Sequence, residues 1–299
     1  MKCPICQSLD LKEIELSGYK YIKCESCHTL RLKIFPKTVY RKSYYNGRFS
    51  LANLLFKPLE RLFYLIRNSY SGLEKKELWI DVGAGEGNFL KSVRAENKIG
   101  VEISEDGRKL MQKAGIITYT QEEFLRKKDL TADVISFWHV LEHIEKPWVY
   151  LEAAGKNLVK NGKIIIGIPN NQSFEFKLFK KYWFHLVPKY HYWQFTASSM
   201  SLLLKRLGFK IIKIDYWSPE HHLAGILQSF INATDNSDNV LHKLVKRGTE
   251  KVDLSFEDGL IILFWLTLGL PIVFLFWMVQ SLTKRSGTVV IVASPSKNV

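Results

Sequence analysis

Short apolar runs alternate with amphipathic stretches along most of this chain. Five runs have the length of a strand, at residues 78–82, 98–102, 116–120, 132–138 and 163–168. Stretches with apolar residues at helical spacing separate them. Repeated strand–helix units of this kind favour a parallel sheet with helices on both faces and ligands at the carboxyl ends of its strands. The pattern therefore predicts an α/β fold with a doubly wound sheet.

The first of these strands ends in a turn suited to a nucleotide. Asp81 closes the apolar run, Gly83, Gly85 and Gly87 follow at alternate positions, and a helical pattern starts near Phe89. Glycine allows a positive φ and lets a ligand approach where a Cβ would clash. The start of the helix presents free N–H groups. We expect a nucleotide-binding turn here.

The glycine spacing indicates which nucleotide binds. In a dinucleotide fold the pattern is G-x-G-x-x-G, but here the third glycine, Gly87, comes one residue early. Asp-x-Gly-x-Gly-x-Gly is typical of S-adenosylmethionine (SAM) sites. Glu102 ends the next apolar run after Gly87, where an acid can accept both hydroxyls of a ribose. Residues 78–216 therefore resemble the class I SAM-dependent methyltransferases of types 11 and 23. The alternative is a glycine-rich turn in another α/β protein.

The resemblance implies SAM as cofactor and a seven-stranded, Rossmann-like methyltransferase sheet. Asp81 and the three glycines would hold the methionine part of SAM, and Glu102 would hold the ribose. Ile103 and Trp138 would contact the adenine or its surroundings. The methyl group would pass in line from the sulfonium to a nucleophile, helped mainly by the positioning of the two partners.

A seventh, antiparallel strand is needed beside the sixth, which we expect at residues 209–216. The only candidate is the apolar run at residues 288–293. We therefore expect a methyltransferase domain of residues 78–216 and 288–299, with residues 217–287 as a hydrophobic helical insertion between strands six and seven.

The insertion contains an uncharged stretch, residues 260–282, which is long enough to cross a bilayer as one helix. If residues 288–293 join the sheet, however, both ends of this stretch lie on the same side. Gly269 and Pro271 weaken a helix at its centre, and basic residues flank both ends. We predict a membrane-dipping, re-entrant or interfacial hairpin. A single transmembrane span and a soluble core or dimer element are the alternatives.

All four cysteines lie close to the N-terminus, in two pairs, Cys3-x2-Cys6 and Cys24-x2-Cys27. Two such pairs place four thiolates around a tetrahedral ion. Disulfides and a redox Cys-x-x-Cys are the alternatives. Because all four ligand positions are cysteines, we predict a structural Zn²⁺ in a zinc-ribbon-like module of residues 1–34.

The remaining composition bears on partners and location. The net charge of +14 favours an anionic partner such as a phosphate-bearing substrate or the cytoplasmic membrane leaflet. The first residues lack the apolar region of a signal peptide, so we expect a cytoplasmic, membrane-associated protein. Residues 35–77 are predicted to form a linker and lid helices, with an amphipathic helix at residues 51–70 on the sheet, over the cofactor or at a membrane surface.

The segment after the fourth strand carries candidate catalytic residues, His139, Glu142 and His143. In the methyltransferases that this chain resembles, this segment closes one wall of the site. His139 and His143 can face the transferred methyl group or hold the loop together. Two histidines and a carboxylate this close in sequence are also donors for a divalent cation.

A later segment carries the preferred general base. Residues 190–196 resemble the His-x-x-x-aromatic-Thr/Ser segment of sugar C-methyltransferases that also have an N-terminal zinc module. In those enzymes the matching histidine acts as a base, so the resemblance implies that His191 is the base here. An unperturbed histidine titrates near neutral pH and can therefore accept a proton. A Glu usually precedes it, whereas Tyr190 stands here. The alternative role of His191 is to cap the following helix.

These features together predict a membrane-associated SAM-dependent methyltransferase that acts on a small-molecule or lipid-linked glycan acceptor. One alternative is an O-methyltransferase of a lipid quinone, in which the hydrophobic insertion recruits the substrate. Others are an RNA methyltransferase or RNA-binding protein, and a SAM-binding scaffold. Nucleic acid is the weaker expectation, because no Asn/Asp-Pro-Pro-Tyr motif follows the fourth strand.

Overall fold

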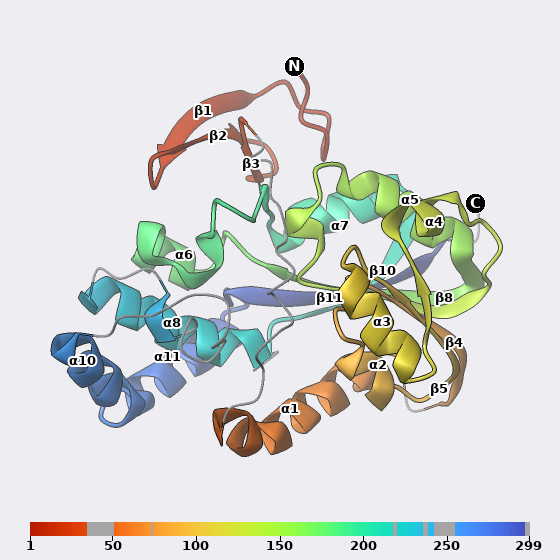
Figure 1. Cartoon of the computed structure of the whole chain (residues 1–299). Coiled ribbons are helices and arrows are strands. Elements are labelled where there is room, and N and C mark those ends of the chain that lie inside the picture. Colours follow the sequence, from red (N-terminus) through yellow and green to blue (C-terminus); the bar gives the residue numbers. More distant parts are fainter. Residues whose placement is uncertain (35–50, 73, 218–219, 236–238, 242–254, 297–299) are drawn as a thin grey trace.

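The computed structural model describes residues 1–34, 51–72, 74–217, 220–235, 239–241 and 255–296. These residues form a large central sheet with helices on both faces and a smaller sheet at the N-terminus (Figure 1). The predicted linker falls mostly on residues 35–50, which lie outside the described residues.

The central sheet has seven strands in the order β10-β11-β8-β7-β4-β5-β6. They are β4 (Lys76–Val82), β5 (Ala95–Val101), β6 (Ile117–Tyr119), β7 (Ala132–Trp138), β8 (Leu158–Pro169), β10 (Phe209–Asp215) and β11 (Thr288–Pro295). Strands β4 to β8 are mutually parallel, and β11 runs antiparallel between β8 and β10. The predicted seven-stranded α/β fold, including the late seventh strand, is confirmed.

Helices cover both faces of this sheet. On one side lie α1 (Leu51–Ser69), α2 (Asn88–Ser92) and α3 (Glu105–Lys113); on the other lie α4 (Gln121–Arg126), α5 (Pro147–Asn157) and α7 (Ala197–Arg206) (Figure 1). Alternate strand residues therefore supply two apolar cores. Trp79 and Val134 face the first set of helices, and Ile80 and Ile135 face the second.

Between β10 and β11 the chain forms the predicted helical insertion. It contains α8 (Glu220–Asp235), α10 (Phe256–Leu266) and α11 (Leu270–Leu282). The chain bends by 58° at the break between the last two helices. A Cβ on Gly269 would clash with Trp265, so only glycine allows the chain to pass this closely at the bend.

No single helix among the described residues is long and apolar enough to cross a membrane. Helices α10 and α11 meet the length and composition required only when they are taken together as a bent pair. A bent pair of this kind fits a broken span as well as a re-entrant loop, so the predicted hairpin stays a prediction.

The N-terminal sheet contains β1 (Leu11–Leu16), β2 (Tyr19–Cys24) and β3 (Leu30–Leu32). Its fourth strand, β9 (Trp193–Gln194), comes from the middle of the chain and pairs with β3 through Leu30 and Arg31. The cysteine-containing module is therefore joined by backbone hydrogen bonds to the segment that follows His191.

Four short helical segments complete the wall between the two sheets. They are η2 (Leu141–His143) after β7, and α6 (Phe174–Phe179), η3 (Lys180–Tyr182) and η4 (Phe184–Leu186) after β8. Apolar residues of this wall share one cluster with the N-terminal strands and with α8 and α11.

Candidate active site and metal-binding residues

The glycine turn after β4 has the backbone that its sequence predicts. Gly83, Gly85 and Gly87 have φ angles of 77°, 58° and 72°, a left-handed region that favours glycine. A Cβ on Gly83 would also clash with Val140, which follows β7. The turn therefore needs glycine both for its left-handed backbone and for the close packing of Val140 on Gly83.

Asp81 lies buried at the end of β4. The Ser136 hydroxyl on the neighbouring strand donates a 2.5 Å hydrogen bond to Asp81 Oδ1 and accepts one from Trp79 Nε1. Burial raises the pKa of Asp81 to about 7, against the opposing effects of Ser136 and Arg67. Sequence reasoning did not single out Ser136. The sequence feature that marks Ser136 is a polar residue within the apolar run of β7.

Glu102 faces the same turn from the end of β5. Its two carboxylate oxygens accept hydrogen bonds from the Gly85 and Ser104 backbone amides, each at 2.9 Å. Each oxygen keeps a second lone pair, so the carboxylate can still accept two ribose hydroxyls. Ile103 beside it is half exposed. The residues present therefore fit SAM, whose adenosine would lie over Glu102 and Ile103.

An unforeseen cation lies near this end of the sheet. The Arg67 guanidinium on α1 lies 4.7 Å from the centre of the Trp138 ring and 5.5 Å from that of Phe89. Trp138 thus packs between α1 and α2 at the end of β7. Nothing in the spacing of basic residues on α1 distinguishes Arg67 from its neighbours.

The three predicted catalytic histidines gather around one buried carboxylate. Glu142 on η2 is fully buried, and His139 Nδ1 lies 3.4 Å from its Oε1. The rings of His143 and His191 meet edge to face with centroids 4.6 Å apart. Glu142, His143 and His191, here called the Glu/His cluster, each offer a ligand atom, and these atoms all lie within 4.8 Å of one another.

Backbone carbonyls fix the two rings of the Glu/His cluster. His143 Nδ1 lies 2.9 Å from the Tyr190 carbonyl oxygen, and His191 Nδ1 lies 2.7 Å from that of His185. Because a carbonyl only accepts, both Nδ1 atoms donate. His185 was not predicted, since nothing in the aromatic, basic segment around it marks one position.

The surroundings set the protonation of this cluster. Burial, with a smaller contribution from His143, lowers the pKa of His191 to about 3. Burial would raise the pKa of Glu142, but His139, with smaller contributions from His143 and His191, lowers it to about 2. Near neutral pH, His191 is therefore neutral and Glu142 beside it is ionised. The role of His191 as general base stays a prediction, and a base of such low pKa takes up a proton poorly near neutral pH.

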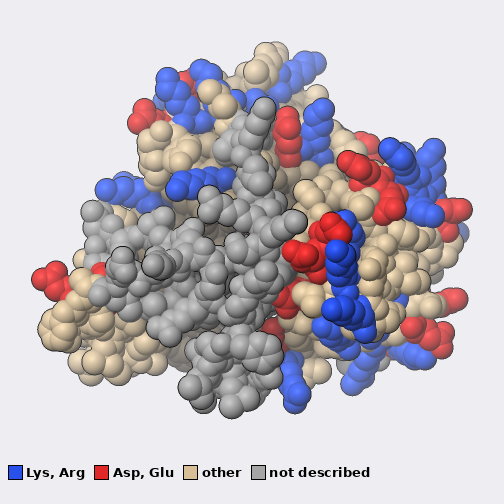
Figure 2. Space-filling model, in the orientation of Figure 1, with Lys and Arg blue, Asp and Glu red and all other residues tan. Residues whose placement is uncertain are grey.

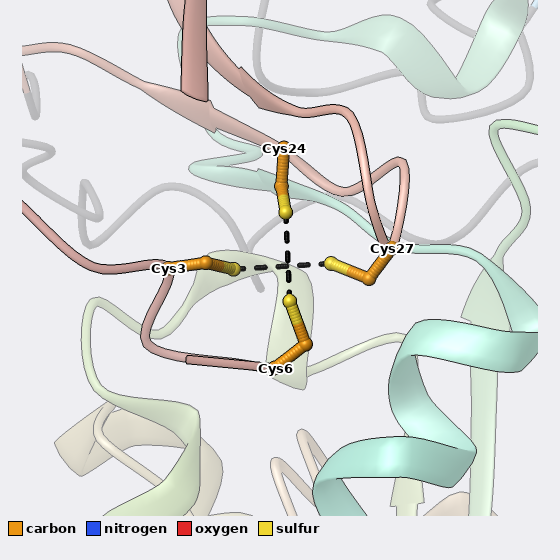
Figure 3. A group of neighbouring side chains, drawn as sticks. All are labelled: Cys3, Cys6, Cys24 and Cys27. Carbon is orange, nitrogen blue, oxygen red and sulfur yellow. Dashed lines mark hydrogen bonds between the residues drawn. The ribbon is translucent and has the colours of Figure 1, made fainter. Parts of the chain in front are cut away.

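The four cysteines converge as their spacing predicts (Figure 3). The Sγ atoms of Cys3 and Cys27 are 3.8 Å apart, and those of Cys6 and Cys24 are 3.5 Å apart. Sulfurs bound tetrahedrally to zinc at about 2.3 Å lie about 3.8 Å from one another, so this group, here called the Cys cluster, fits a tetrahedral ion.

The Cys cluster is tied to the methyltransferase domain. The Thr196 hydroxyl donates to the Cys27 carbonyl at 3.3 Å, Asn171 Nδ2 donates to the His28 carbonyl at 2.9 Å, and Arg206 donates to the Ile5 carbonyl at 2.8 Å. The predicted zinc ligands therefore lie against the wall that carries His191.

A seven-stranded sheet with an antiparallel seventh strand, a left-handed glycine turn after β4 and acids at the ends of β4 and β5 defines a SAM-dependent methyltransferase. The model of a family described as a methyltransferase domain matches residues 51–214, over half of the chain. The chain belongs to this family.

The chain also has a relative of similar sequence among known proteins. An uncharacterised protein of Methanocaldococcus jannaschii is 36% identical over 139 residues, which cover 45% of this chain and 65% of that protein. The match thus spans slightly less than two thirds of the relative.

Two solved structures share the fold at low sequence identity. The cyclase SpnF is 12% identical, with a TM-score of 0.52 over 87% of this chain and 88% of its own. The second structure is a chain from the Haloferax volcanii complex between the Trm112 methyltransferase activator and its proposed methyltransferase. It is 11% identical, with a TM-score of 0.50 over 87% of this chain and 100% of its own. A protein named as a cyclase shares this architecture, so the acceptor has to be argued from the site rather than from the fold.

Proposed function

We propose that this SAM-dependent methyltransferase works at a membrane surface and methylates a small-molecule or lipid-linked glycan acceptor. Asp81 and the glycine turn hold the methionine part of SAM, Glu102 holds the ribose, and Ile103 and Trp138 contact the adenine or its surroundings. A structural Zn²⁺ occupies the Cys cluster.

The exposed apolar surface of α10 and α11 carries the proposal. Large apolar side chains between one third and three quarters exposed are Leu260, Leu263, Phe264, Leu266, Leu268, Leu270, Ile272, Phe274, Leu275, Met278, Val279 and Leu282. Figure 2 shows few charged groups over α10, whereas Lys and Arg lie over the N-terminal strands. Apolar surfaces of this extent mark protein or membrane contacts. The absence of any charge from residue 260 to residue 282 favours the membrane.

The hairpin is also linked to the wall of the candidate active site. Gln280 on α11 forms two hydrogen bonds with Glu175 on α6. Gln280 Nε2 donates to Glu175 Oε1 at 3.4 Å, and Gln280 Oε1 accepts from the Glu175 backbone N–H at 3.3 Å. On α8, the Ser229 hydroxyl accepts from the Phe184 N–H, and Asn232 donates to the Tyr182 carbonyl. A bilayer held by α10 and α11 would thus lie beside the wall between the two sheets, which suits an acceptor with a lipid tail.

Vesicle flotation tests the membrane contact. The full chain should float with vesicles of equimolar phosphatidylcholine and phosphatidylglycerol. The double variant Leu268→Glu/Leu275→Glu should bind at least about tenfold more weakly, because each leucine withdrawn from the interface loses about 1.5 kcal/mol or more. Both positions are exposed, at 73% and 63%, so the fold should tolerate the change.

Leu202→Glu on α7 is the matched control, since Leu202 is also an exposed leucine but lies outside the hairpin. It should float like the unaltered protein. Equal flotation of the double variant and the control would contradict the membrane role.

Transfer of a labelled methyl group from SAM to total lipid and glycan extracts tests the acceptor. Label in a glycan or its lipid-linked precursor supports the proposal. Label in a quinone or in RNA would replace it with one of the alternatives.

A further inference from the structure

We propose that the Glu/His cluster is a second metal site, which binds a divalent cation that takes mixed nitrogen and oxygen ligands, such as Zn²⁺, Co²⁺, Ni²⁺ or Fe²⁺. Glu142, His143 and His191 are the ligands. Imidazole and carboxylate donors suit these ions.

The three donors already stand almost as closely as ligands do. Their ligand atoms lie within 4.8 Å of one another. Ligand atoms on one ion at bond lengths of about 2.0 to 2.2 Å lie about 3 to 3.5 Å apart, so shifts on the order of 1 Å bring them into place.

The histidines are oriented in the manner of metal ligands. Each Nδ1–H donates to a backbone carbonyl, of Tyr190 for His143 and of His185 for His191. This bond fixes the tautomer and leaves Nε2 with its lone pair as the coordinating atom.

Glu142 supplies an independent reason for a cation. It is fully buried, and neither carboxylate oxygen receives a hydrogen bond from any described residue. The nearest basic nitrogen is His139 Nδ1, which lies 3.4 Å from Oε1. A buried carboxylate without hydrogen bonds is costly, and a bound cation compensates that cost.

The site is built on fixed backbone rather than on a free loop. Tyr192 N donates to the Glu142 carbonyl at 2.8 Å, and Trp193 Nε1 donates to the Ile144 carbonyl at 3.0 Å. These bonds tie the η2 segment to the segment that carries His191. Strand β9 then pairs with β3 of the N-terminal sheet. Ligands on supported backbone keep their geometry when the ion binds.

Two histidines and one carboxylate leave coordination positions open for another oxygen. In the reaction, that position would hold an oxygen of the methyl acceptor. This last step rests on the proposed function, whereas the binding of the cation does not.

Metal content tests the site directly. The full chain, equilibrated with Co²⁺ and freed of excess ion, should contain two ions per chain, one in the Cys cluster and one in the Glu/His cluster. Glu142→Gln and His191→Asn should each reduce the content to one. His28→Asn is the control, because His28 is an exposed histidine with a φ of 58°, which asparagine also adopts. It should keep two ions.

The absorption spectrum keeps the test independent of folding in the variants. Unaltered protein with Co²⁺ should show intense thiolate-to-cobalt bands together with weaker visible bands from nitrogen and oxygen ligation. Both variants should lose only the weaker bands. One ion per chain with thiolate bands alone in the unaltered protein, or two ions in both variants, would overturn the second site. Failure of the unaltered protein to transfer methyl groups while it holds two ions would contradict the proposed function and leave the second site in place.

Discussion

The Cys cluster and the Glu/His cluster are both connected to one short strand, β9. The Cys cluster has four identical donors near the N-terminus, and the strand that leaves it, β3, pairs with β9. The Glu/His cluster takes two donors from η2 and the third, His191, from just before β9. One strand thus serves two groups of different chemistry.

The difference lies in what each group leaves available. Four thiolates fill a tetrahedral ion and leave no position for a substrate, which is typical of a structural site. Two imidazoles and one carboxylate leave positions open. With an ion bound, the first group would stabilise the wall, and the second would have room for an acceptor.

Loss of one thiolate should have the largest effect on this arrangement. Zinc in structural sites of small domains binds with about 10 kcal/mol or more, so Cys24→Ser should unfold β1 to β3. Because β3 is the partner of β9, the Trp193 and Gln194 amides should exchange faster as well. Hydrogen exchange measured by mass spectrometry checks this.

His28→Asn should leave the exchange of both sheets unchanged, since the His28 backbone carbonyl that accepts from Asn171 is retained. Protection of β9 that persists in Cys24→Ser would mean that the Cys cluster does not support the Glu/His cluster.

Removal of the third donor should act on turnover instead. His191→Asn should slow methyl transfer to the extracted acceptor about 100-fold, a loss within the range for either a metal ligand or a general base. The affinity for SAM should not change, because Asp81 and Glu102 lie on other strands. Kinetics with labelled SAM and isothermal calorimetry measure the two quantities.

Tyr190→Phe is the control for His191→Asn, because it keeps the backbone carbonyl that orients His143 and removes only a hydroxyl. An unimpaired rate in His191→Asn would remove His191 from the reaction.

The Cys cluster could be predicted from the sequence more completely than the Glu/His cluster, for a physical reason. Zinc-binding cysteines come in local pairs with fixed spacing, so all four ligands were predictable. The third donor of the Glu/His cluster lies far along the chain from His143, and the hydrogen bonds from Tyr192 N to the Glu142 carbonyl and from Trp193 Nε1 to the Ile144 carbonyl hold its segment beside η2. His191 was found from a family resemblance, but its proximity to Glu142 was not.

In the central sheet too, local patterns could be predicted from the sequence, but contacts between elements could not. The glycine turn, Glu102 and the late strand β11 follow from local patterns and from the need for a seventh strand. Ser136 and Arg67 act on Asp81 and Trp138 across strands and helices. Contacts of that kind depend on register and packing, which no local spacing records.

A change in the cofactor site should separate SAM binding from both clusters. Glu102→Ala should weaken SAM binding about 10- to 100-fold, since hydrogen bonds to a charged group contribute about 1.5 to 3 kcal/mol. The metal content should stay at two ions per chain. Calorimetry and metal analysis check both.

The matched control for Glu102→Ala is Glu105→Ala. Glu105 is a nearby acid with a side chain 68% exposed, so its loss should leave SAM binding intact. Full affinity for SAM in Glu102→Ala would contradict the ribose assignment.

The smallest expected effect is the response of SAM binding to pH. Burial raises the pKa of Asp81 to about 7 from an ordinary value of 3.8. The folded protein without SAM therefore retains this proton up to about pH 7. The contribution of Asp81 to the free energy of unfolding falls as the pH rises from about 4 to 7.

SAM carries positive charge and favours the ionised carboxylate. Its affinity should therefore fall about fourfold between pH 8 and pH 6.5, in line with the loss of ionised Asp81. Calorimetry across this range should show the slope in the unaltered protein and a flat response in Asp81→Asn, whereas an equal slope in both would assign the proton to another group.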